Sequence, residues 1–122
     1  MAVTNKGIEI LGDLLRGDST DKPLYLSFSG TNATTFDESL TTLGSEFIRK
    51  SVTWAQTGIQ SQFTIELAST EANGSYIKST GLHIGSSLDS ADTFSYNESF
   101  IGSKTSSINV QVEGETLIRR YV

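Results

Sequence analysis

His83 is the one histidine of this 122-residue chain, and any hydrolytic triad or zinc site would have to use it. A triad sets such a base beside a nucleophile, and a zinc site needs three or four ligands. No cysteine is present to supply a thiolate ligand. His83 stands between Leu82 and Ile84 in a strand-like run, and an isolated histidine rarely acts alone. We interpret it as a structural or surface residue.

The acidic side chains offer a second kind of chemistry, because two carboxylates facing one cleft would suit a glycosidase. The spacing of the 14 Asp and Glu residues singles out no such pair. Asp89 and Asp92, with Ser87 and Ser90, could ligate calcium from one loop, but no EF-hand or glycine-aspartate repeat surrounds them. We interpret them as solvated loop charges. No glycine-rich phosphate motif occurs either, and we expect no catalytic residue, metal or cofactor.

Aromatic side chains are the remaining candidates for ligand contact, because exposed rings can stack on sugars. Aromatic residues at alternating strand positions are more often part of a core, which leaves ligand binding as the weaker interpretation. The rings that would have to gather on one surface are Tyr25, Trp54, Tyr76, Tyr96 and Tyr121. A carbohydrate- or receptor-binding β-sandwich module is therefore kept as an alternative function.

The charge balance argues against a nucleic-acid partner. The chain has 9 basic and 14 acidic residues, for a net charge of −5. A phosphate-binding surface needs a clustered basic face, whereas the basic residues here are scattered and the tightest pairs are Arg49-Lys50 and Arg119-Arg120. Charged residues also interrupt the first seventeen positions, which predicts neither a secretory signal nor a membrane span. We expect synthesis in the cytoplasm and no contact with a membrane.

The N-terminal segment predicts an amphipathic helix over about residues 4–16. Thr4 is a suitable N-cap and Gly17 a suitable left-handed exit, while Gly7 and Gly12 each cost about 1 kcal/mol relative to Ala. A helix this short is stable only if it docks an apolar stripe, and we expect it to dock on the sheet of its own domain. The expected stripe consists of Ile8, Leu11 and Leu15, with Leu14 beside them.

Alternating apolar and polar residues predict six to eight strands and a single β-rich domain over residues 1–122. The clearest pattern runs from Ile59 to Leu67, and Glu46–Ala55 is expected to form one strand with Arg49 on the face opposite Ile48. Asn73-Gly74 predicts either a hairpin or a longer loop with a turn at its tip. The fold class is mainly β, as an antiparallel β-sandwich or a flattened barrel with one short N-terminal helix.

The C-terminal residues Arg119, Arg120 and Tyr121 are candidates for a docking edge. Such a segment could add to the sheet of a partner, or it could be the last strand of its own sheet. The two interpretations are compatible with one another.

The features of the chain follow a characteristic order: a helix opening with 4–11, a strand with a Gly-Thr exit over 24–31, an acidic turn into a strand over 46–52, Glu71-Ala72-Asn73-Gly74 before a strand ending in Gly81-Leu82, and Lys104-Thr105 before the final strands. This order resembles that of small structural proteins of tailed bacteriophages and tailed archaeal viruses. The resemblance covers most of the chain and brings no catalytic residues with it.

The resemblance implies a non-enzymatic virion structural protein, made in the host cytoplasm and carried on the particle. It would be a capsid decoration protein or a tail, baseplate or fibre-attachment component. Its partners would be other capsid or tail proteins and further copies of itself, since symmetric assembly is the rule for such parts and a trimer is one option. The candidate docking residues are Ile8, Leu11 and Leu15 on the helix, and Arg119, Arg120 and Tyr121 in the tail.

Overall fold

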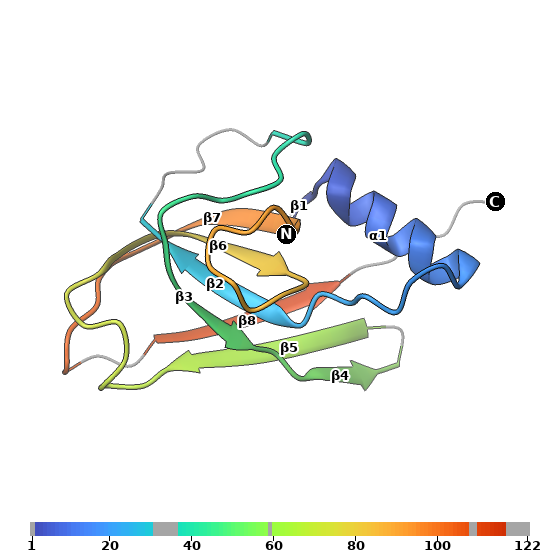
Figure 1. The fold of residues 1–122 in the computed structure, drawn as a ribbon. Coiled ribbons are helices and arrows are strands. Elements are labelled where there is room, and N and C mark those ends of the chain that lie inside the picture. Colours follow the sequence, from blue (N-terminus) through green and yellow to red (C-terminus); the bar gives the residue numbers. More distant parts are fainter. Residues whose placement is uncertain (1, 31–36, 59, 108–109, 117–122) are drawn as a thin grey trace.

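The computed structural model describes residues 2–30, 37–58, 60–107 and 110–116 of the chain. These residues form one helix and eight strands (Figure 1). The elements are β1 (Ala2–Val3), α1 (Asn5–Arg16), β2 (Tyr25–Ser29), β3 (Glu46–Ser51), β4 (Trp54–Thr57), β5 (Gln60–Leu67), β6 (Tyr76–His83), β7 (Thr93–Ser103) and β8 (Val110–Thr116). The predicted mainly β fold with a short N-terminal helix is thus confirmed.

The strands form two antiparallel sheets, a large one in the order β1-β7-β6-β2-β3 and a small one in the order β4-β5-β8. Their apolar faces enclose one core, to which β2, β5, β6, β7 and β8 all contribute buried side chains. In the described part of the chain neither sheet closes onto the other. The predicted sandwich is therefore the right architecture, and the flattened barrel is not.

The clean alternation predicted for residues 59–67 is realised in β5. Phe63, Ile65 and Leu67 are buried in the core, whereas Thr64 and Glu66 between them are exposed. A strand with one dry and one wet face behaves in this way when only one side of its sheet is covered. Ile59 lies outside the described residues.

The predicted hairpin at Asn73-Gly74 is wrong, and the alternative of a longer loop is right. The strands on either side, β5 and β6, belong to different sheets. The connection is held by Lys104 of the segment after β7, whose backbone pairs with Gly74 and Ser75 at 2.8 Å each and whose Nζ donates to Asn73 Oδ1 at 2.9 Å. The turn-forming pair is present, but pairing across it is not, because the two strands cover opposite sides of the core.

The single strand predicted over Glu46–Ala55 is two strands, β3 and β4, in different sheets. The chain changes sheet at Val52, which is buried and whose N–H donates to Leu24 O at 2.8 Å. A continuous apolar alternation cannot reveal such a change, since both strands present their apolar side chains to the same core.

Helix α1 begins and ends as predicted. Thr4 accepts a hydrogen bond from the Gly7 N–H, and Gly17 closes the helix with φ +75°. The helix also docks on its own large sheet, where the Thr4 hydroxyl donates to Thr93 O at 2.6 Å. Gly7 makes this close approach possible, because a Cβ there would lie 2.2 Å from Phe94 O. A glycine that weakens the isolated helix is therefore needed for docking.

The face on which α1 docks differs from the expected one. Gly7 and Ile10 are the buried residues of the helix, and Leu14 packs partly buried against the core. The expected stripe instead faces solvent: the exposed fractions are 61% for Ile8, 43% for Leu11 and 89% for Leu15. We call these three residues the helix stripe. The helix thus has apolar residues on two faces, and tertiary packing uses the one that contains Gly7.

Candidate functional site

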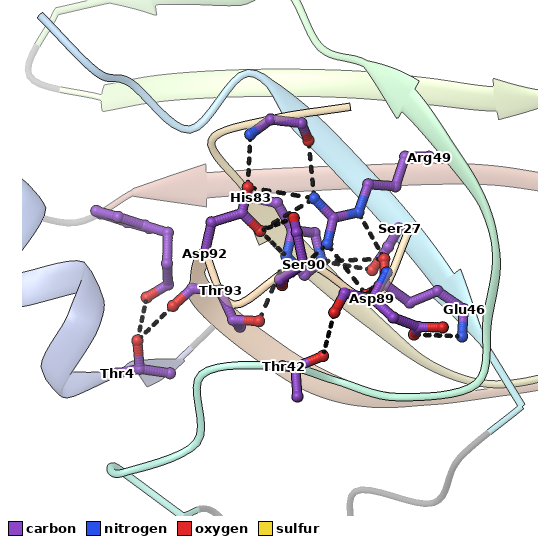
Figure 2. Close-up of polar contacts among 12 residues, drawn as sticks. Thr4, Ser27, Thr42, Glu46, Arg49, His83, Asp89, Ser90, Asp92 and Thr93 are labelled. Atoms are coloured by element: carbon purple, nitrogen blue, oxygen red, sulfur yellow. Dashed lines mark hydrogen bonds and ion pairs between the residues drawn. The ribbon is translucent and has the colours of Figure 1, made fainter. Parts of the chain in front are cut away.

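A cluster of charged and hydroxyl side chains lies on the outer face of the large sheet, beneath residues 84–92 (Figure 2). On that face β2 contributes Ser27, β3 contributes Arg49 and β6 contributes His83. The members of this polar cluster are Ser27, Glu46, Arg49, His83, Asp89, Ser90, Asp92 and Thr93. The loop buries a sheet face that would otherwise be wet.

Arg49 is the centre of the polar cluster. Its Nε and Nη2 donate to the two carboxylate oxygens of Glu46 at 2.6 Å and 3.1 Å. Its Nη1 donates to Asp92 Oδ1 at 3.0 Å and to Gly85 O at 2.8 Å, and Nη2 also reaches Ser90 O at 3.4 Å. Burial lowers the pKa of Arg49, but Glu46 and Asp92 outweigh it and raise that pKa. The guanidinium is thus a permanent cation that fixes the loop to β3.

A β-bulge brings Glu46 to the same face as Arg49. Residues three apart on a regular strand point to opposite faces. Here Phe28 pairs with Ile48, but Ser29 pairs with Glu46, so β3 has one extra residue at this point. Bulges of this kind redirect a side chain, and this one turns Glu46 toward the cluster.

Glu46 and Asp89 exchange hydrogen bonds across the edge of the cluster. The Glu46 N–H donates to Asp89 Oδ1 at 3.1 Å, and the Asp89 N–H donates to Glu46 Oε2 at 3.0 Å. Asp89 adopts a left-handed backbone, φ +57°, in making this contact. The loop is therefore held by its backbone as well as by the Arg49 ion pairs.

Asp92 holds the other end of the loop. Its carboxylate accepts from Gly85 N at 2.7 Å and from Ser90 Oγ at 2.9 Å, in addition to Arg49. Burial raises the pKa of Asp92, but these hydrogen bonds and the guanidinium outweigh it and leave the pKa below its usual value. Asp92 thus stays ionised as the counter-charge of Arg49.

His83 is fully buried between two hydroxyl groups. Its Nε2 lies 2.6 Å from Ser27 Oγ, and its Nδ1 lies 3.3 Å from Thr93 Oγ1. Burial and the nearby Arg49 charge lower the pKa of His83 to about 4, although Asp92 acts in the opposite direction. Gly81 leaves room for the ring, since a Cβ there would lie 3.0 Å from Nε2. The imidazole is therefore neutral near pH 7.

Ser27, His83 and Asp92 are connected in the order of a hydrolytic triad, but a substrate cannot reach them. His83 Nδ1 lies 3.5 Å from Asp92 Oδ1, on the side of the ring opposite Ser27. A catalytic serine must meet an external acyl group, whereas Ser27 and His83 are both 0% exposed. No buried side-chain nitrogen or oxygen in the described part of the chain lacks a hydrogen-bond partner. In this arrangement the groups stabilise the loop and the sheet.

His83 was interpreted as a structural or a surface residue, and its burial shows that the surface alternative is wrong. The interpretation of the loop acids as solvated charges is wrong for Asp92, which is paired with Arg49. Sequence reasoning also placed Arg49 correctly on the face opposite Ile48 but missed that it is buried. The sequence signal that could have indicated this burial is an arginine in a predicted strand with a glutamate three residues before it. The loop acids that complete the cluster lie about forty residues away along the chain, beyond the reach of any local pattern.

The structure describes the candidate docking residues of the helix but not those of the C-terminal tail. The helix stripe is assembled on one exposed face of α1, next to the face that docks on β7. Arg119, Arg120 and Tyr121 lie outside the described residues, and their role stays a prediction. No described helix has the length and apolar character needed to cross a membrane.

The aromatic candidates do not gather on one surface in the described part of the chain. Trp54 packs edge-on against Phe63, with ring centroids 5.0 Å apart, and its indole N–H donates to Pro23 O. Tyr96 is buried, whereas Tyr76 is exposed with the Lys78 ammonium over its ring.

Comparisons of the chain with protein-family models, with curated proteins and with solved structures found no match. Its function must therefore be argued from its own residues.

Proposed function

We propose that this chain is a non-enzymatic structural protein of the virion of a tailed phage or virus. It assembles in multiple copies on the particle, as a capsid decoration protein or as a tail, baseplate or fibre-attachment component. The order of sequence features described above supports this class of protein.

The exposed helix stripe is the observation that carries the proposal. Three large apolar side chains share one helix face, and Leu15 is 89% exposed. Grouped apolar side chains on a folded surface mark protein–protein contacts far more often than isolated ones do. Because α1 is fixed to the large sheet by Thr4 and Ile10, the stripe is presented on a rigid support.

The polar cluster supports a structural role in a second way. Arg49, Glu46 and His83 are buried, and Arg49 pairs with Glu46 and Asp92, which fixes the long loop on the sheet without offering a nucleophile to solvent. A particle component needs a rigid outer surface of this kind. Carbohydrate or receptor binding is less well supported, because Trp54 and Tyr96 are engaged within the domain.

The test is whether the chain is a stoichiometric part of particles. Particles of the virus that encodes it are purified by density gradient, and the chain is quantified by mass spectrometry against the major capsid protein. We expect a fixed, repeatable copy number. Absence of the chain from infectious particles would overturn the proposal.

A matched pair of variants connects this test to the helix. L11E places a charge in the stripe, and L88E places the same charge at a residue of similar exposure in the 84–92 loop. We expect L11E to lower incorporation into particles and L88E to leave it unchanged. Equal incorporation of both variants would show that α1 is not the docking face.

A further inference from the structure

We propose that the helix stripe binds the same stripe of a second copy of this chain, with the two α1 helices antiparallel about a twofold axis near Leu11 and Gly12. This inference rests on the proposed function, in which copies assemble through α1, and it names the partner and the geometry of that contact. The site is a surface of one helix, and the occupant is the identical surface of another molecule.

The spacing of the stripe suits an antiparallel pair. Ile8, Leu11 and Leu15 follow the i, i+3, i+7 pattern of a helix seam. Ile8 and Leu15 are equally far from the middle of the stripe, so a twofold axis at that point sets Ile8 of each copy opposite Leu15 of the other. Leu11 then lies beside the Leu11 of the second copy. Each exposed apolar side chain is covered by this arrangement.

The charges beside the stripe decide the direction of pairing. Glu9 and Arg16 lie seven residues apart on one flank of the stripe, with side chains that are 63% and 62% exposed. In an antiparallel pair this flank meets the same flank of the other copy, so that Glu9 approaches Arg16 twice, once on each side of the axis. A parallel pair would instead place the Glu9 and Arg16 flanks of the two copies on opposite sides of the pair, where these charges do not meet.

The ion pairs that Glu9 and Arg16 make within one copy can be replaced at little cost by pairs between two copies. Glu9 faces Lys6 at 3.7 Å, and Arg16 contacts Asp13 and Asp18 at the exposed end of the helix. Exposed ion pairs of this kind contribute roughly 0–1 kcal/mol, so little is lost when they rearrange. The mixed signs also offset the repulsion between two copies that each carry a net charge of −5.

Gly12 lies next to the proposed axis and lets the helices come close. A Cβ at this position would meet only the Arg16 side chain within 4 Å, and no side chain of residue 12 separates the two backbones. Glycine at position 7 is explained by the docking of α1 on β7, whereas no contact in the described part of the chain requires glycine at position 12. The close approach of the second copy explains the glycine at position 12.

The contact is small, and this sets the expected affinity. A helix of 12 residues spans about 18 Å, so a contact between two such helices alone buries an area at the low end of the range for specific interfaces. We expect a dimer with a Kd on the order of micromolar, measured by sedimentation velocity over a concentration series. At high concentration the molar mass should approach twice 13.2 kDa.

Cysteine substitution tests the geometry directly, because the chain has no cysteine of its own. A residue beside a twofold axis lies next to its own copy, so L11C should form a disulfide-linked dimer under mild oxidation. I8C and L15C should each cross-link poorly alone and efficiently when mixed, since they lie opposite one another. T64C, on the exposed face of β5, is the control for random collision and should cross-link several-fold less than L11C.

Charge reversal tests the direction of pairing independently. E9R or R16E converts two attractions into two repulsions, and each should raise Kd roughly tenfold. The double variant E9R/R16E restores opposite charges across the axis and should recover most of the wild-type affinity. Far-ultraviolet circular dichroism of all three variants shows whether α1 is still folded.

The outcomes separate this inference from the proposed function. A chain that is monomeric at all concentrations but present on particles overturns the inference alone, and another virion protein or another segment of the chain then covers the stripe. A trimer, or I8C that cross-links with itself rather than with L15C, also overturns it. A dimer that forms as described in a chain absent from particles sustains the inference and overturns the function.

Discussion

Arg49 and Glu46 meet through two parallel hydrogen bonds, of 2.6 Å and 3.1 Å, and neither side chain has any solvent exposure. A β-bulge sets them on one face of β3, and Asp92 supplies the second negative charge. A buried ion pair costs desolvation energy when it forms, but removing one member leaves an uncompensated charge. The stability of the loop over residues 84–92 therefore depends on Arg49.

R49M should destabilise the fold by about 3–5 kcal/mol, because it leaves Glu46 and Asp92 buried without a cation. The measurement is the free energy of unfolding in urea at pH 7, at a protein concentration below the dimer Kd. R16M is the matched control, since Arg16 also pairs with an acid three residues away but is 62% exposed, and it should cost no more than about 0.5 kcal/mol. Similar losses in the two variants would contradict the role assigned to Arg49.

Stability should fall as the pH is lowered from 6.5 to 4. The pKa of His83 is about 4 in the folded chain and 6.5 in the unfolded chain, so the unfolded chain takes up a proton first in this window. The loss is on the order of 3 kcal/mol over the window, at 1.36 kcal/mol per pKa unit. Asp92, whose folded pKa is lowered, adds a further loss below its ordinary value of 3.8.

H83Q tests the assignment of that pH dependence. The variant carries no titrating group at this position, so its free energy of unfolding should change less between pH 6.5 and 4 than that of the wild type. The slope is the readout, and it is independent of any constant loss of stability from the lost ring contacts. An unchanged slope in H83Q would assign the effect to other groups.

The two glycines of α1 should respond oppositely to alanine. G7A places a Cβ 2.2 Å from Phe94 O and 2.7 Å from Val3 Cγ1, so α1 must move away from β7 and the melting temperature should fall. G12A meets only the flexible end of Arg16 and should gain up to about 1 kcal/mol in helix propensity. Thermal melts at a concentration below the dimer Kd check both. A G7A variant as stable as the wild type would contradict the close docking of α1.

A serine-directed fluorophosphonate should not label the native chain. Ser27 lies 2.6 Å from His83 Nε2 but is 0% exposed, so the reagent cannot reach its hydroxyl. Intact mass spectrometry after incubation at pH 7 is the measurement, with a known serine hydrolase as the positive control. Stoichiometric labelling that is lost in S27A would show that the loop opens and that the triad-like arrangement is reactive.

The sequence by itself determined the elements whose signals are local. Alternation over residues 60–67 fixed β5, because a strand has a period of two wherever one face is dry. Thr4 and Gly17 fixed the ends of α1, since capping depends on residues within one turn. The mainly β class followed from the sum of such segments.

Tertiary structure alone decided which surfaces are buried. Both faces of α1 carry apolar residues, and the docked face is the one where Gly7 permits contact with Phe94, a residue far away in the chain. Asn73-Gly74 encodes a turn, but the choice of sheet for β6 depends on pairing with β2 and β7. Arg49 is buried because Asp92, 43 residues further on, folds back over it. Each of these features depends on contacts between residues far apart in the sequence, which a local sequence pattern cannot predict.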